Sequence, residues 1–198
     1  MIKTTSDRGV GPELALEFAN TLVSDRSGRD LLSHGPQLRD WIAARASQLG
    51  PVSADTERLA EFRRLRTSIR GLLAAVAAGQ PLHDADATIV NGAAVAAASW
   101  PELVIDDSGA PSSVGRSAAT DPTAHALADI AASAIRLVGS PDRLRVGACE
   151  GPGCRRFFLA KHHARRWCDS GVCGNRVRVA SWARRRRAEH DSASRDLL

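Results

Sequence analysis

The chain contains no tyrosine, and aromatic residues of all kinds make up 4% of its 198 residues. Apolar residues still reach 43%, but many of them are alanine. Alanine is the strongest helix former, yet it buries little surface per residue. The composition therefore predicts closely packed helices with a modest free energy of unfolding per residue.

Long apolar segments are also missing. No stretch approaches the roughly 18 uninterrupted apolar residues of a membrane helix, and the alanine-rich segment 85–98 is too short and too small in side-chain volume. The first nine residues contain no apolar run of the kind that a secretory signal needs. These absences predict a soluble, cytoplasmic protein with no membrane partner.

Catalytic motifs are absent as well. The chain has neither a phosphate-binding loop nor a nucleophile elbow. Asp106, Asp107 and His125 are conceivable acid–base groups, but two aspartates before Ser-Gly are typical of a turn, and a lone histidine on a helix is usually structural. The pattern argues against an enzyme.

Charge divides the chain into two parts. Residues 143–187 carry 13 Lys and Arg against two acidic residues, a net charge of +11. Residues 1–142 carry 13 Lys and Arg against 17 acidic residues, a net charge of −4. A locally basic segment is typical of a protein with a polyanionic partner. We therefore expect two domains, 1–142 and 143–198.

Apolar periodicity predicts a helical first domain. Helices are expected near 12–22, 38–49, 54–78 with Ser53 as N-cap, 84–98 and 122–138, with a strand at 103–105 and a return strand near 113–114. Five arginines of the third helix lie mostly off its apolar stripe and are interpreted as a solvated face: Arg58, Arg63, Arg64, Arg66 and Arg70.

All four cysteines fall within 25 residues, in the pattern Cys-x4-Cys-x13-Cys-x4-Cys formed by Cys149, Cys154, Cys168 and Cys173. Zinc prefers four tetrahedral thiolates, and closed sites of this kind are structural. A pair of disulfides or four unrelated thiols are the alternatives, but clustered cysteines in a reducing compartment more often bind metal. His162 and His163 could compete as ligands, although four cysteines already complete the site. The pattern predicts one structural Zn²⁺.

The residues around the cysteines predict further elements. A strand is expected at 144–146, one arm of a hairpin at 157–159 and a basic helix over 174–190, with Val172, Val179 and Trp182 facing the zinc module. Trp167 is expected to pack over the site, and a base-stacking role is the alternative.

Four consecutive arginines in the last helix repel one another, which favours a polyanionic partner and, above all, nucleic acid. Arginines near the cysteines could instead balance the negative thiolates. The candidate nucleic-acid contacts are Arg165, Arg166, Asn175, Arg176, Arg178, Arg184, Arg185, Arg186 and Arg187. Phosphate contacts alone do not distinguish DNA from RNA.

Two motifs resemble known families. Arg-Arg-Trp-Cys at 165–168 and Cys-Gly-Asn-Arg at 173–176 resemble the CGNR zinc finger, and Ala-Leu-Glu-Phe-Ala-Asn-Thr-Leu at 15–22 is similar to the opening of ABATE domains. The resemblance implies a bacterial, stress-induced transcriptional regulator that binds double-stranded DNA through its zinc finger. The expected fold is mainly α with a small β-hairpin: a helical domain, then a treble-clef-like zinc module that ends in a basic helix.

An alternative function remains. The acidic helical domain could be the working part, as a sensor of a small-molecule effector or as a module that forms homodimers. The zinc finger would then mediate RNA or protein contacts. No set of residues within 1–142 identifies a particular ligand.

Overall fold

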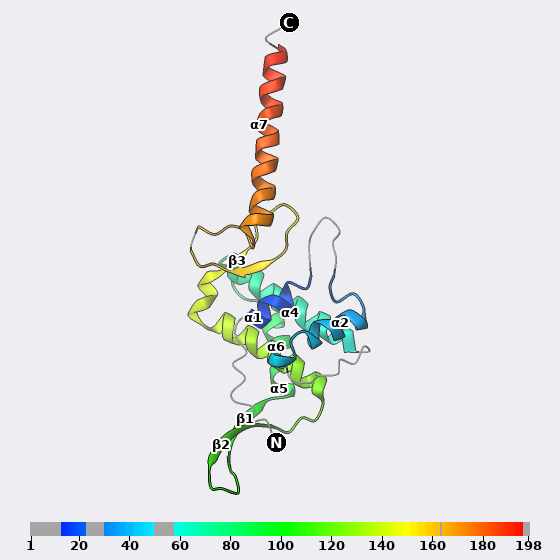
Figure 1. Ribbon diagram of the computed structural model, residues 1–198, viewed down its shortest axis with the longest axis vertical. Helices are drawn as coiled ribbons and strands as arrows, with labels where there is room; N and C mark the ends of the chain where they lie inside the picture. The colour runs from blue at the N-terminus through cyan, green and yellow to red at the C-terminus, as the bar shows by residue number, and fades with distance from the viewer. Residues whose placement is uncertain (1–12, 23–29, 50–57, 163, 196–198) are drawn as a thin grey trace.

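The computed structural model describes residues 13–22, 30–49, 58–162 and 164–195, with side chains to residue 187. This part of the chain is mainly helical with two small antiparallel two-stranded sheets, which confirms the expected fold class (Figure 1). The elements are α1 (Glu13–Ala19), α2 (Gly35–Ala43), α3 (Ala46–Leu49), α4 (Leu59–Ala77), α5 (Asp84–Ala96), β1 (Ser99–Ile105), β2 (Pro111–Ser117), α6 (Pro122–Gly139), η2 (Pro141–Arg145), β3 (Val146–Ala148), β4 (Phe157–Leu159), η3 (Ser170–Gly174) and α7 (Asn175–Arg195).

The helices follow local capping and periodicity. Asp121 caps α6 by accepting a hydrogen bond from the Thr123 amide at 2.8 Å, and Pro122 occupies the first turn, as the sequence predicts. The expected second helix is divided into α2 and α3. The proposed N-cap Ser53 lies outside the described residues, and within them Arg58 precedes α4 without a side-chain cap.

The core lies where α1, α4 and α6 meet, and four of the chain's eight aromatic side chains belong to it: Phe18, Trp41, Phe62 and Phe157. The ring of Phe18 on α1 lies 5.3 Å from Trp41 on α2 and 6.3 Å from Phe62 on α4, measured between centroids. Leucines, isoleucines and alanines fill the remaining space. The core also includes Val146 of β3 and Phe157 of β4, so the hairpin beside the cysteines packs onto the helical part.

Arg66 on α4 is buried, so the interpretation of this helix's arginines as a solvated face is wrong for Arg66, although it holds for the exposed Arg64. The Arg66 guanidinium forms a two-pronged ion pair with Asp30, at 2.5 and 2.6 Å, and donates to the Thr21 hydroxyl at 3.0 Å. A β-bridge between Leu22 and Asp30 places the carboxylate at this position. The bidentate geometry suits arginine because its planar fork matches a carboxylate.

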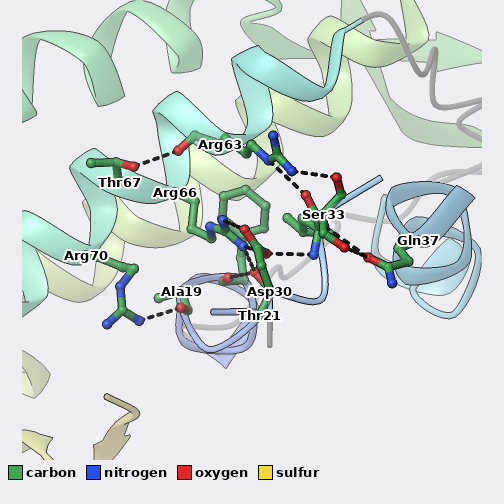
Figure 2. A network of polar contacts seen from close by, with 11 residues as sticks. Ala19, Thr21, Asp30, Ser33, Gln37, Arg63, Arg66, Thr67 and Arg70 are labelled. Atoms are coloured by element: carbon green, nitrogen blue, oxygen red, sulfur yellow. Dashed lines mark hydrogen bonds and ion pairs between the residues drawn. The ribbon is translucent and has the colours of Figure 1, made fainter. Parts of the chain in front are cut away.

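Two neighbouring arginines on the same helix also form hydrogen bonds to backbone carbonyls, as Figure 2 shows. Arg63 donates to the carbonyls of Leu32 and Ser33 at 2.9 and 2.7 Å. Arg70 donates to the Ala19 carbonyl at 2.7 Å. The guanidinium groups of both arginines donate hydrogen bonds to backbone carbonyls of the N-terminal segments. These bonds hold the N-terminal segments against α4.

The two sheets differ in their surroundings. β1 and β2 form a twisted ribbon that projects from one end of the molecule, and its apolar residues Trp100, Leu103 and Ile105 are exposed (Figure 1). Both strands are longer than expected. The predicted strand 144–146 is replaced by a short 3-10 helix to Arg145, and the strand begins at Val146. No described helix is long and apolar enough to span a bilayer.

Replacing Asp30 by Asn should lower the free energy of unfolding at pH 7 by about 3 kcal/mol, because it leaves the buried Arg66 charge unpaired. The hydrogen bond from Arg66 holds the pKa of Asp30 below its usual range. The stabilisation is therefore complete above the unfolded-chain pKa of about 4 and is lost as the pH falls through the lowered folded-state pKa. Urea denaturation at pH 7 and below pH 4 measures both effects.

The control is Asp107→Asn, in the exposed turn between β1 and β2. It should leave stability unchanged at both pH values. An equal loss in the two variants would contradict the assignment of a special role to the Arg66–Asp30 pair.

Candidate zinc centre and nucleic-acid interface

The four cysteines converge on one point. Their sulfurs all lie within 4.8 Å of one another. The Sγ atoms of Cys154 and Cys168 are 3.8 Å apart, and those of Cys168 and Cys173 are 3.7 Å apart. Zn–S bonds of about 2.3 Å in a tetrahedron place sulfurs about 3.8 Å apart, whereas a disulfide needs about 2.05 Å. The arrangement is that of a four-thiolate zinc site, and the alternative disulfides are excluded in this geometry.

The first ligand pair is positioned by the β3–β4 hairpin. Cys149 follows β3, and its amide donates to the Arg156 carbonyl at 2.9 Å, which extends the ladder by one step. The knuckle then turns through Gly153, whose φ of 73° favours glycine. At Gly151, a Cβ would lie 3.0 Å from the Cys173 Cβ, so the turn must pass close to the opposite ligand.

The second pair is positioned by a capped turn. The Asp169 carboxylate accepts a hydrogen bond from the Val172 amide at 2.8 Å, and the Asp169 carbonyl accepts one from the Cys173 amide at 3.0 Å. This turn is the π-helical segment η3, which places Cys173 inward and continues directly into α7. The zinc site therefore holds the first residues of α7 against the hairpin.

The pKa values of the clustered thiols favour a divalent cation at the centre of the cluster. Burial disfavours the Cys149 thiolate, but the amides of Cys168 and Gly151 donate to it and hold its pKa below the usual range. Burial and the neighbouring Cys149 sulfur raise the pKa of Cys168, and burial raises that of Cys173. Four crowded thiolates cannot ionise together without a positive charge at their centre, which zinc supplies. No described histidine joins the cluster, so His162 is not a ligand, and His163 lies outside the described residues.

Arg165 and Arg166 are engaged in the zinc module itself. All three guanidinium nitrogens of Arg165 donate to backbone carbonyls, those of Leu159, Trp167 and Cys168. Arg166 pairs with Glu150 at 2.5 Å. Both side chains remain exposed to solvent on their outer faces. These contacts brace the backbone around the ligands, and the expectation that arginines balance the thiolate charge stays a prediction.

Arg176 and Arg178 secure the start of α7 in a similar way. Arg176 donates to the Pro152 carbonyl at 3.3 Å, and Arg178 to the Ser170 carbonyl at 3.1 Å. Trp167 packs with the ligands, and a Cβ on Gly174 would approach its ring to 3.0 Å. The packing role predicted for Trp167 is confirmed, and this contact explains the glycine of the Cys-Gly-Asn-Arg motif.

The expectation that apolar residues of α7 face the zinc module is wrong. Val172, Val179 and Trp182 are 58%, 56% and 55% exposed. The reason is visible in Figure 1, where α7 rises alone from the module instead of folding back across it. The four arginines Arg184, Arg185, Arg186 and Arg187 are exposed along this free part of the helix. Arg186 lies over the Trp182 ring, 5.1 Å from its centroid.

Asn20 connects the helical part to the zinc hairpin, a role that the sequence pattern did not reveal. Its side-chain amide donates to the Phe157 carbonyl at 2.9 Å, and its amide oxygen accepts a hydrogen bond from the Phe157 N–H at 2.8 Å. The side chain thus pairs with the outer edge of β4 as a neighbouring strand would. The sequence feature that could have indicated this role is the position of Asn20, a polar residue directly after the apolar face of α1.

Arg70 makes a second connection between the same parts. Besides the Ala19 carbonyl, it donates to the Arg155 carbonyl at 2.9 Å, one residue beyond the ligand Cys154. Its guanidinium also lies 5.0 Å from the centroid of the Phe157 ring. Burial lowers the pKa of Arg70, with smaller effects from the charges of Arg66 and Arg155. The knuckle and α4 therefore share one polar contact.

Fold and site define a helical domain followed by a four-cysteine zinc module. Family comparisons agree: residues 13–141 match the ABATE family, described as "Putative stress-induced transcription regulator", and residues 145–186 match the CGNR zinc finger. The chain belongs to the ABATE family and carries a CGNR zinc finger at its C-terminal end. A comparison with curated protein sequences found no match.

Replacing Cys168 by Ser should abolish tight zinc binding, because it removes a thiolate that touches two other ligands. The parent should contain one zinc per chain, and chelation should unfold the hairpin and release the start of α7. Native mass spectrometry measures the metal content, and circular dichroism follows the helix. His162→Ala is the matched control and should keep its zinc; full zinc occupancy in Cys168→Ser would contradict the site.

Replacing Asn20 by Leu should weaken the attachment of the hairpin while roughly keeping the size of the side chain. The Phe157 carbonyl would lose its donor and the Phe157 N–H its acceptor, at a cost of about 1–3 kcal/mol for each group. Hydrogen exchange at the amide of Phe157 should accelerate, and Asn91→Leu on the exposed face of α5 should leave it unchanged. Equal protection of Phe157 in all three proteins would contradict this role of Asn20.

Proposed function

We propose that the protein is a DNA-binding transcription regulator in which the zinc site presents α7 to double-stranded DNA. The observation that carries the proposal is the projection of α7 from the body with four exposed, consecutive arginines. No described carboxylate pairs with any of the four. A helix with this density of unpaired positive charge gains free energy by neutralising phosphates and releasing counterions. Membership of a transcription-regulator family supports the same role and a non-enzymatic one.

The exposed apolar residues of α7 support a groove-binding helix over a purely electrostatic one. Asn175, Val179, Trp182 and Arg186 follow the spacing i, i+4, i+7 and i+11, so they share one face. This face combines an amide, which can pair with adenine, with apolar groups, which can contact thymine methyls. We propose that it reads base edges in the major groove.

The remaining arginines of the tract would contact phosphates. Arg184, Arg185 and Arg187 point around the other sides of the helix, where the two DNA backbones flank an inserted helix. Arg165, Arg166, Arg176 and Arg178 are candidates for a secondary role, since each already donates to a backbone carbonyl or a carboxylate. They would hold the module in position and offer their exposed faces to the backbone.

DNA is favoured over RNA by the shape of the exposed element. A helix about 10–12 Å wide fits the major groove of B-form DNA, whereas the deep, narrow major groove of A-form RNA excludes it. We propose further that residues 1–142 and 143–198 act as two units held together by Asn20 and Arg70, and that the protein works in the cytoplasm, where thiols stay reduced.

Arg185→Gln should reduce affinity for all duplex sequences and lower the slope of log K against log salt by about 0.9, which corresponds to one lost phosphate contact. Titration of a labelled duplex between low and moderate salt measures the slope. Arg39→Gln, an exposed arginine of α2, is the matched control and should leave the slope unchanged. A parent protein whose affinity does not depend on salt would overturn the proposal.

Trp182→Ala should instead change sequence preference. Because its ring lies on the proposed base-reading face, its loss should reduce the ratio of specific to non-specific affinity by roughly tenfold, the usual value of one base contact, with little change in salt slope. Selection from random duplexes with the parent supplies the preferred sequence. If the variant retained the full ratio, Trp182 would lie outside the interface.

A further inference from the structure

A cavity of about 350 Å³ opens between α4, α5 and α6, away from the zinc site. Its lining is mainly apolar and includes Leu65 of α4, Ile89 of α5 and Leu127 of α6. Sites for small molecules in proteins have volumes of about 300–1,000 Å³ and are lined mostly by apolar side chains with a few polar groups. The cavity meets both conditions.

One side of α5 carries small residues along the cavity. Ile89, Gly92, Ala93 and Ala96 follow the spacing i, i+3, i+4 and i+7, so they share one helix face, and all four line the cavity. Within α5, Val90 is the residue that is fully buried. Ala93 packs partly against the core, whereas Gly92 and Ala96 are exposed. The cavity is therefore open to solvent along this face of α5.

Gly92 is an unusual residue for the middle of α5. A glycine in the middle of a helix costs about 1 kcal/mol relative to alanine. At Gly71 a Cβ would meet the Asp86 carboxylate, which would have to move. At Gly92 a Cβ would meet nothing within 4 Å. Gly92 lines the cavity and is exposed to solvent, so neither turn geometry nor a neighbouring atom requires a glycine there, and a larger side chain would project into open space.

Polar groups at the rim indicate the chemistry of that molecule. The Arg58 guanidinium is occupied by Glu61 and Asp121. Arg64 and Thr88 also line the cavity, and neither side chain has a partner within the part of the chain that the structure describes. A guanidinium and a hydroxyl on one rim suit a carboxylate, and the apolar interior suits a hydrocarbon body.

We infer that the cavity between α4, α5 and α6 binds a small amphipathic carboxylate, with its acid group at Arg64 and Thr88 and its apolar body against Gly92 and Ala93. The site is separate from the DNA-binding surface and does not depend on it. The helical domain would then have a ligand of its own, a small amphipathic carboxylate. The match between ligand and site rests on the Arg64 guanidinium, the Thr88 hydroxyl and a lining that is otherwise mainly apolar, because the charged lining residues Arg58 and Glu61 pair with each other.

The test uses the full-length zinc protein and a pair of probes that share a ring system. 1-Naphthoate carries the carboxylate, and 1-naphthylmethanol is its neutral counterpart. Titration calorimetry should show that naphthoate binds more tightly than the alcohol by about tenfold, the usual value of one charge-assisted hydrogen bond. Arg64→Gln should remove this difference while leaving the affinity for the alcohol unchanged.

Gly92→Leu provides the decisive variant because its side chain would occupy the cavity. It should lower affinity for both probes at least tenfold and, by removing a helix-interior glycine and filling open space, raise the melting temperature. Asn91→Leu adds the same side chain at the neighbouring exposed position of α5 and should leave binding unchanged. Gain of stability together with loss of binding at the same residue identifies a site kept open for a ligand.

Three outcomes would overturn the inference. Undiminished naphthoate binding to Gly92→Leu would place the probe elsewhere, for example on the arginines of α7. Absence of binding of both probes to the parent would show that the cavity does not accept this class. A fall in the melting temperature of Gly92→Leu would show that the space at Gly92 is not open.

Discussion

The pairing of the Asn20 side chain with the backbone of Phe157 is the contact on which the arrangement of the two parts depends. A two-stranded hairpin is marginally stable in water, and the outer edge of β4 presents an N–H and a carbonyl that would otherwise lack partners. Asn20 satisfies both groups at 2.8 and 2.9 Å. The Phe157 ring then enters the helical core, where Arg70 covers it. The zinc module is therefore an extension of the helical fold.

Buried arginine supplies much of the polar framework in a chain that has few aromatic residues. One helix, α4, carries Arg63, Arg66 and Arg70, and each guanidinium bonds to backbone carbonyls or a carboxylate of segments far away in sequence. A guanidinium can serve several acceptors at once, so one residue secures a loop that a large apolar side chain would otherwise have to hold. The cost is desolvation of a charge, which the Asp30 carboxylate offsets for Arg66.

The zinc site also holds together segments that are distant in sequence. It gathers four thiolates from a hairpin and a π-helical turn, and by doing so it fixes the direction in which α7 leaves the body. Among the described residues, Arg165, Arg176 and Arg178 bond to backbone carbonyls around the cysteines, whereas Arg185, Arg186 and Arg187 form no hydrogen bond or ion pair. Arginines near the cysteines thus help to build the module, and those farther along α7 present exposed guanidinium groups. The four thiolates would leave a bound zinc ion no open coordination position, so it would act as a structural centre.

The amino-acid sequence alone determined the features that depend on neighbouring residues. Helix periodicity, the Asp121 cap and the four cysteine ligands are local patterns, because each spans a few turns or one knuckle, and the structure confirms them. The tertiary structure decided whether Arg66 is buried, what Asn20 pairs with, whether Trp182 faces inward or outward, and how far the small residues of α5 are covered. Each of these depends on which distant segment lies opposite the residue. An arginine off an apolar stripe has the same sequence pattern whether water or Asp30 faces it, and only the packing of the chain distinguishes the two.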